Sequence, residues 1–130
     1  MTNAQLNKIL YVEDDVDIQA VAKMALEIVG GFEVLTCNSG QEALDAAEAG
    51  FEPDLLLLDV MMPGMDGPTT LAGLRQLAQM ASTPVVFMTA KVQSAEVAHY
   101  TSLGALGVIA KPFDPMQLAD QIRQLWQQKQ

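Results

Sequence analysis

Leu55-Leu56-Leu57-Leu58-Asp59 is a run of four apolar residues that ends on an acid. Such a short, continuously apolar run is typical of a strand buried on both faces, as in parallel sheets. Similar runs occupy residues 9–12, 85–88 and 108–110, and a weaker one occupies residues 34–37. Longer segments with helical spacing lie between them, so the pattern predicts an α/β fold.

Five helical segments follow the five strands. Apolar residues recur at helical spacing within residues 16–29, 39–49, 69–80 and 92–103, and the last helix has Asp114 as its cap and Pro115 in its first turn. Right-handed βα crossovers then give a doubly wound, five-stranded parallel sheet flanked by five helices. With no linker or repeat to divide the chain, we expect residues 1–130 to form a single domain.

The composition excludes several classes of protein. Sixteen acids against seven bases give a net charge of −9, which argues against direct nucleic-acid binding or attachment to an anionic membrane. One cysteine, Cys37, excludes an intramolecular disulfide and fits a reducing compartment. The absence of a membrane-length apolar run and of an apolar signal core predicts a cytoplasmic protein without membrane insertion.

Acids gather where the predicted strands end. Glu13-Asp14 follow the first strand, Asp59 ends the third and Lys111 follows the fifth. In such sheets ligands bind at the carboxyl ends of the strands. Two carboxylates about 4 Å apart repel by roughly 4 kcal/mol at an effective dielectric constant of 20, and a divalent cation removes that cost. Oxygen ligands suit Mg²⁺, and an ionised aspartate beside Mg²⁺ and a lysine is a nucleophile suited to phosphoryl transfer.

Four motifs carry a family resemblance. Glu13-Asp14, the loop at residues 59–67, Thr89-Ala90 and Lys111-Pro112-Phe113 resemble the receiver domain of two-component response regulators, in particular chemotaxis-regulator-like receivers. The similarity covers about residues 7–128. It implies a flavodoxin-like fold with strand order 2-1-3-4-5.

The resemblance assigns a phosphoacceptor and a metal site. Asp59 would accept the phosphoryl group. Mg²⁺ would be the cofactor, held by oxygen atoms from Glu13, Asp14, Asp59 and the backbone carbonyl of Met61. Asp14 would bind directly and Glu13 partly through water, whereas Asp15 is expected to cap the first helix instead.

The resemblance also assigns switch residues. Lys111 would contact the phosphoryl oxygens from a cis Lys111-Pro112 bond. Thr89 would move toward the phosphoryl group, and Ala90 would leave that approach clear.

The function implied is signalling in a phosphorelay rather than enzymatic turnover. A partner histidine kinase or histidine phosphotransfer protein would supply the phosphoryl group. The domain would assist its own phosphorylation and dephosphorylation, and phosphorylation would switch contacts with a downstream protein target. The surface expected to change lies within residues 92–126.

Three positions bear on how the switch works. Val108 stands where many receivers have an aromatic residue, and a short β-branched side chain cannot make the large rotation expected there. Readout is therefore predicted to depend on the segment after Thr89 or on the packing of Val108. Met61 and Lys91 occupy the two positions that resemble the family's tuning sites for the lifetime of the acyl phosphate, and an apolar Met61 predicts slow self-dephosphorylation.

Other functions remain as alternatives. A degenerate receiver that binds partners without phosphorylation would lack an acceptor, acid pair or lysine, yet all are present. An aspartate-nucleophile phosphohydrolase places its nucleophile after the first strand rather than the third. A flavin carrier needs a phosphate-binding loop after the first strand, where Glu13-Asp14-Asp15 would repel phosphate.

Overall fold

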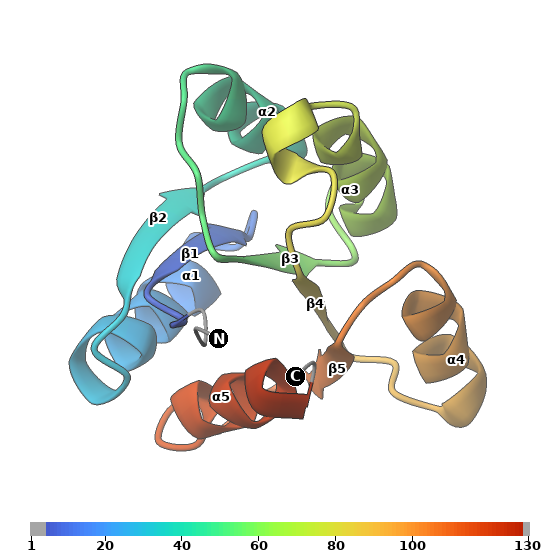
Figure 1. Cartoon of the computed structure of the whole chain (residues 1–130). Helices are drawn as coiled ribbons and strands as arrows, with labels where there is room; N and C mark the ends of the chain where they lie inside the picture. Colours follow the sequence, from blue (N-terminus) through green and yellow to red (C-terminus); the bar gives the residue numbers. More distant parts are fainter. Residues whose placement is uncertain (1–4, 129–130) are drawn as a thin grey trace.

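The computed structural model describes residues 5–128 and contains a five-stranded sheet. All neighbouring strands are parallel, in the order β2-β1-β3-β4-β5, which confirms the predicted order (Figure 1). The strands are β1 (Lys8–Val12), β2 (Glu33–Cys37), β3 (Leu55–Asp59), β4 (Val85–Thr89) and β5 (Gly107–Ala110).

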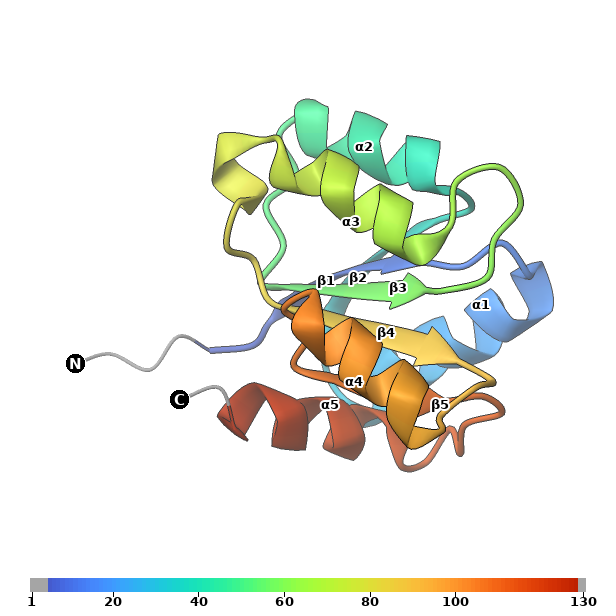
Figure 2. The same cartoon turned by 90° about the vertical axis from the view of Figure 1, so that its right-hand side faces the viewer.

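Helices cover both faces of this sheet, as Figures 1 and 2 show. α1 and α5 pack on one face, and α2, α3 and α4 pack on the other. The helices are α1 (Val16–Met24), which continues as a π-helical turn (Ala25–Val29), α2 (Gly40–Glu48), α3 (Gly67–Arg75), α4 (Ser94–Ser102) and α5 (Leu118–Gln128).

The sheet divides the interior into two apolar cores. On β1, Ile9 and Tyr11 point to the α1 and α5 side, whereas Leu10 and Val12 point to the other. Every side chain of β3 and β4 is buried. Each leucine of this kind contributes about 2 kcal/mol through burial, which explains why the apolar runs predicted these strands correctly.

The expected caps of α1 and α2 are present. The Asp15 carboxylate accepts hydrogen bonds from the amides of Asp17 and Ile18, at 3.0 and 3.1 Å. Ser39 Oγ accepts from the amide of Glu42 at 3.1 Å. The Glu42 side chain returns to the amide of Asn38 at 2.8 Å, one residue before the position that a capping box uses.

The predicted helix over residues 69–80 extends too far at its end. α3 begins at Gly67, where the Asp66 side chain caps the amide of Thr69, and it ends at Arg75. A separate 3₁₀ turn spans Ala78–Met80. The Arg75 guanidinium donates to the carbonyls of Met80 and Thr83 at 2.9 and 2.6 Å, so it stabilises a turn that helical spacing alone does not reveal.

The start of the last helix also differs from the prediction. Asp114 accepts a hydrogen bond from the amide of Met116 at 2.9 Å, but residues 115–117 form a turn and α5 begins at Leu118. α4 similarly begins at Ser94 rather than Val92. Cys37, at the end of β2, is buried.

Within residues 5–128, none of the helices combines the length and the apolar character needed to cross a membrane.

Candidate functional site

The carboxyl ends of the strands bring the predicted polar residues to one edge of the sheet. Glu13 follows β1, Asp59 ends β3, Thr89 ends β4 and Lys111 follows β5. Because all five strands are parallel, these ends meet at the same edge, on the right in Figure 2. Glu13, Asp59 and Thr89 are all at least 98% buried.

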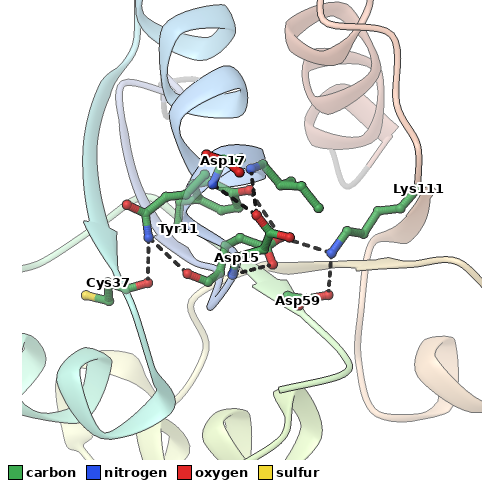
Figure 3. Close-up of polar contacts among 9 residues, drawn as sticks. Tyr11, Asp15, Asp17, Cys37, Asp59 and Lys111 are labelled. Carbon is green, nitrogen blue, oxygen red and sulfur yellow. Dashed lines mark hydrogen bonds and ion pairs between the residues drawn. The ribbon is translucent and has the colours of Figure 1, made fainter. Parts of the chain in front are cut away.

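The Lys111 ammonium joins two buried carboxylates (Figure 3). Lys111 Nζ lies 3.0 Å from Glu13 Oε1 and 3.0 Å from Asp59 Oδ1. The side chain of Lys111 is only 15% exposed. One cation therefore balances part of the negative charge of both acids in a poorly hydrated place. The Lys111-Pro112 peptide bond is cis, as the resemblance implied.

Two further donors hold the Glu13 carboxylate. The Tyr11 hydroxyl donates to Glu13 Oε1 at 3.4 Å, and the backbone amide of Asp15 donates to Oε2 at 3.3 Å. Tyr11 has no exposed surface. The buried acid is thus held from the strand that precedes it and from the helix start that follows it (Figure 3).

The backbone at the ends of β1 and β2 is tied by Gln19 of α1. Its Nε2 donates to the carbonyl of Glu13 at 2.9 Å and to Asn38 Oδ1 at 2.8 Å, and it lies 3.4 Å from the carbonyl of Cys37. The amide of Glu13 donates to the same Cys37 carbonyl at 3.0 Å. These contacts fix the course of the chain on which Glu13 and Asp14 stand.

The electrostatic balance of the site disfavours ionisation of Asp59 in the metal-free protein. Burial, together with the neighbouring Glu13, raises the pKa of Asp59 to about 7, although Lys111 opposes this rise. Burial would lower the pKa of Lys111, but its hydrogen bonds to Asp59 and Glu13 raise it above the ordinary value. Burial and Glu13 also raise the pKa of the Tyr11 hydroxyl.

The acidic residues fit a divalent metal ion. Glu13, Asp14 and Asp59 each offer a carboxylate oxygen, and the three oxygens lie within 4.8 Å of one another. Asp14 is exposed beside the two buried acids, so the cluster opens to solvent on one side. A hard cation that keeps part of its water, such as Mg²⁺, suits an all-oxygen set of this kind.

The loop after Asp59 is held close to the acid's backbone. The amide of Gly67 donates to the carbonyl of Val60 at 2.9 Å. A Cβ atom at Gly67 would come within 2.5 Å of the Asp59 carbonyl oxygen, so glycine is required at this approach. Met61 is 70% exposed. That its backbone carbonyl binds the metal ion stays a prediction.

The predicted switch residues lie beside the cluster but do not join its ion pairs. Thr89 Oγ1 accepts a hydrogen bond from the amide of Lys91 at 3.1 Å. Ala90 and Lys91 are exposed, and among residues 5–128 the cation paired with Glu13 is Lys111 rather than Lys91. Val108 is half-buried on β5 and lines a shallow hollow with Val92 and Leu125.

Sequence reasoning missed Tyr11 and Gln19 as parts of this site. In the sequence, Tyr11 is only one residue of a predicted apolar strand. Its position two residues before Glu13 is the signal that could have identified it, since residues i and i+2 of a strand share a face. Gln19 carries no such signal, because its contacts depend on how α1 packs across the end of β2.

Comparisons with known proteins agree with this geometry. The family model described as "Response regulator receiver domain" matches residues 9–123. The chain is 41% identical over 118 residues to the transcriptional regulatory protein CpxR of Escherichia coli, covering 91% of this chain and 48% of CpxR. It is 36% identical over 116 residues to the alkaline phosphatase synthesis transcriptional regulatory protein PhoP of Bacillus subtilis, covering 89% of this chain and 47% of PhoP.

Solved structures extend the comparison. The chemotaxis protein CheY4 of Vibrio cholerae superposes with a TM-score of 0.83 at 29% identity, covering 93% of this chain and 99% of CheY4. The chain therefore matches nearly all of CheY4 but spans about half the length of the two curated transcriptional regulators.

Proposed function

Because the chain belongs to the response regulator receiver domain family, we propose that Asp59 accepts a phosphoryl group from a phosphohistidine on a partner protein. The donor is a histidine kinase or a histidine phosphotransfer protein, as is expected for this family. Phosphorylation then changes which downstream protein the domain binds.

One observation carries this proposal: Asp59 is 2% exposed, and its carboxylate lies 3.0 Å from the Lys111 ammonium, beside a second buried acid. If Lys111 served only to form a structural ion pair, one carboxylate would be enough to balance its charge. Here an additional carboxylate and the exposed Asp14 add negative charge that a divalent cation would balance.

The transfer step uses the groups at this edge of the sheet. A carboxylate oxygen of Asp59 attacks phosphorus in line with the phosphorus–nitrogen bond of phosphohistidine. That bond breaks, its electron pair stays on the imidazole nitrogen, and a new phosphorus–oxygen bond forms at Asp59. Lys111 contacts the phosphoryl oxygens and stabilises their charge. Glu13, Asp14 and Asp59 would hold Mg²⁺, which supplies further positive charge for the phosphoryl oxygens.

Thr89 provides the link to the rest of the domain. In the structure its hydroxyl accepts from the amide of Lys91, at the beginning of the segment that leads to α4. We propose that Thr89 leaves this contact to bind the phosphoryl group and so shifts the population of a second arrangement of that segment. The face formed by α4, β5 and α5 presents the change to the downstream target.

An exposed apolar face next to the cluster suits the approach of the phosphodonor. Ile18, Val21 and Phe113 line a hollow whose rim includes Lys111. It adjoins a second apolar hollow that also includes Val21 and extends to Met24. A helix of the donor that buries its apolar residues here would bring its phosphohistidine toward Asp59.

Chemical phosphorylation tests the proposal directly. Protein incubated with a small acyl phosphate and Mg²⁺ is expected to gain the mass of one phosphoryl group, as measured by intact mass spectrometry. The matched Asp59→Asn protein and a sample with a chelator are expected to gain none. Unmodified wild-type protein would favour the alternative, a degenerate receiver that binds its partners without phosphorylation.

A further inference from the structure

Tyr11 is a buried phenol whose hydroxyl has no part in the proposed phosphoryl transfer. Its ring lies in the apolar core beneath α1 and α5, with no exposed surface. Its hydroxyl donates to Glu13 Oε1 at 3.4 Å, the same oxygen that lies 3.0 Å from Lys111 Nζ. Tyr11 and Glu13 face the same side because they are two positions apart, with one residue between them, at the end of β1.

We propose that Tyr11 is a positioning residue for the metal site: its hydroxyl holds the Glu13 carboxylate in the orientation in which that acid serves the cation. This inference rests on the proposed function, since it requires that Glu13, Asp14 and Asp59 bind Mg²⁺.

The presence of the hydroxyl supports a specific role. A phenylalanine would fill the same apolar space without placing a polar group in the core. A buried hydroxyl is unfavourable unless it forms a hydrogen bond, and here its acceptor is a carboxylate of the cluster. The hydroxyl therefore contributes a hydrogen bond to Glu13 and is not needed for the packing of the core.

The other donors to Glu13 explain why this contact is needed. Lys111 is shared between Glu13 and Asp59. We expect it to move away from Glu13 when it contacts a phosphoryl group on Asp59. The Tyr11 hydroxyl and the amide of Asp15 do not depend on the state of Asp59. They keep one hydrogen bond on each oxygen of the carboxylate while the ammonium is engaged elsewhere.

Loss of a hydrogen-bond partner of a metal ligand commonly changes metal affinity by about 10- to 100-fold. The contact of 3.4 Å is long, which places Tyr11 at the lower end of that range. For Tyr11→Phe we therefore expect the Mg²⁺ dissociation constant to rise about tenfold. At saturating Mg²⁺ we expect the rate of phosphorylation by an acyl phosphate to stay within a factor of about two of the wild-type rate, since Asp59 and Lys111 are unchanged.

The main experiment measures Mg²⁺ binding by calorimetry, without any phosphodonor. The chain has two tyrosines, so Tyr100→Phe on α4 is the matched control and should bind Mg²⁺ as wild type does. The double variant Tyr11→Phe with Glu13→Gln tests the route of the effect. If Tyr11 acts through Glu13, the tenfold loss disappears in the Glu13→Gln background.

A second measurement avoids substitution altogether. Ring signals of the two tyrosines can be followed by NMR as Mg²⁺ is added to the wild-type protein. The signals of Tyr11 are expected to shift with the same dissociation constant as calorimetry gives, whereas those of Tyr100 stay near their starting positions.

Distinct results separate this inference from the proposed function. An unchanged Mg²⁺ dissociation constant in Tyr11→Phe, or an equal loss with and without Glu13, overturns the role of Tyr11 even if the wild-type protein is phosphorylated. Wild-type protein that binds no Mg²⁺ overturns both. Wild-type protein that binds Mg²⁺ but resists phosphorylation refutes the proposed function alone.

Discussion

Replacing Asp59 by asparagine is expected to make the metal-free protein more stable at pH 8, although it removes the proposed acceptor. Burial and the nearby Glu13 raise the pKa of Asp59 from its ordinary value of 3.8 to about 7. Ionisation is therefore less favourable in the folded chain than in the unfolded chain. The stability that the neutral acid provides is complete below pH 3.8 and is lost progressively until the pH passes about 7.

The size of the effect follows from this difference in pKa. Each tenfold change in proton affinity corresponds to about 1.4 kcal/mol, so ionised Asp59 lowers the free energy of unfolding by up to about 4 kcal/mol. Of this, about 2 to 3 kcal/mol develops between pH 5 and pH 8. Asparagine has no charge to lose, so Asp59→Asn should gain that amount over the wild type between the two pH values.

Urea unfolding at pH 5, 6, 7 and 8 in the presence of a chelator measures this difference. Trp126 is the single tryptophan, is largely buried on α5 and reports unfolding by its fluorescence. Asp120→Asn is the matched control, because Asp120 is an exposed acid on α5. Its stability should follow that of the wild type within about 0.5 kcal/mol at every pH.

The outcome that refutes this reasoning is a parallel pH dependence of the wild type and Asp59→Asn. Such a result would mean that Lys111 and solvent compensate fully for the burial of the Asp59 charge. A loss of stability in Asp59→Asn at pH 8 would be a stronger contradiction, because the ionised acid would then stabilise the fold.

Three substitutions and one decay measurement test separate parts of the site. Lys111→Met leaves two buried carboxylates without their ammonium and should cost about 3 kcal/mol in urea unfolding at pH 8, with a smaller cost at pH 5; equal costs would contradict the charge argument. Gly67→Ala places a Cβ atom 2.5 Å from the Asp59 carbonyl oxygen and should lower stability by about 2 kcal/mol, so an unchanged urea midpoint would show that the loop yields freely. Val108→Tyr should leave phosphorylation-dependent partner affinity unchanged in a binding assay; a large change in switching would count against readout without an aromatic ring. With an exposed, apolar Met61 near the acceptor, phosphorylated protein should decay over minutes or longer in excess Mg²⁺, and decay within seconds would disprove slow self-dephosphorylation.

The sheet was predictable because its central strands are buried on both faces. β1, β3 and β4 lie between two layers of helices, and their sequences are accordingly almost purely apolar. β2 gave a weaker signal for a physical reason. It lies at the edge of the sheet, where Glu33 is exposed and Leu35 and Thr36 are half-buried.

Helix ends were less predictable because distant contacts decide them. Leu77 continues the helical spacing of α3, yet its backbone is extended, with ψ at 129°. The chain turns there because the Arg75 side chain satisfies carbonyls farther along. Propensity and spacing describe the helix itself and carry no information about such contacts.

The sequence was enough to predict which residues meet at the candidate site, but not which hydrogen bonds connect them. The positions of Glu13, Asp59 and Lys111 follow from the parallel order of the strands. The contact between the Tyr11 hydroxyl and Glu13 does not follow from it, because an apolar run is the same signal whether or not one ring carries a hydroxyl.

The two ends of the described chain lie together, away from the acid cluster. Gln5 and Leu6 line the same hollow as Trp126 and Gln127 near the end of α5, as the course of the chain in Figure 2 also shows. The cluster lies at the opposite ends of the strands, and a five-residue strand is about 16 Å long. A biosensor tether or a fluorescent fusion attached near either end would therefore lie away from the acidic cluster.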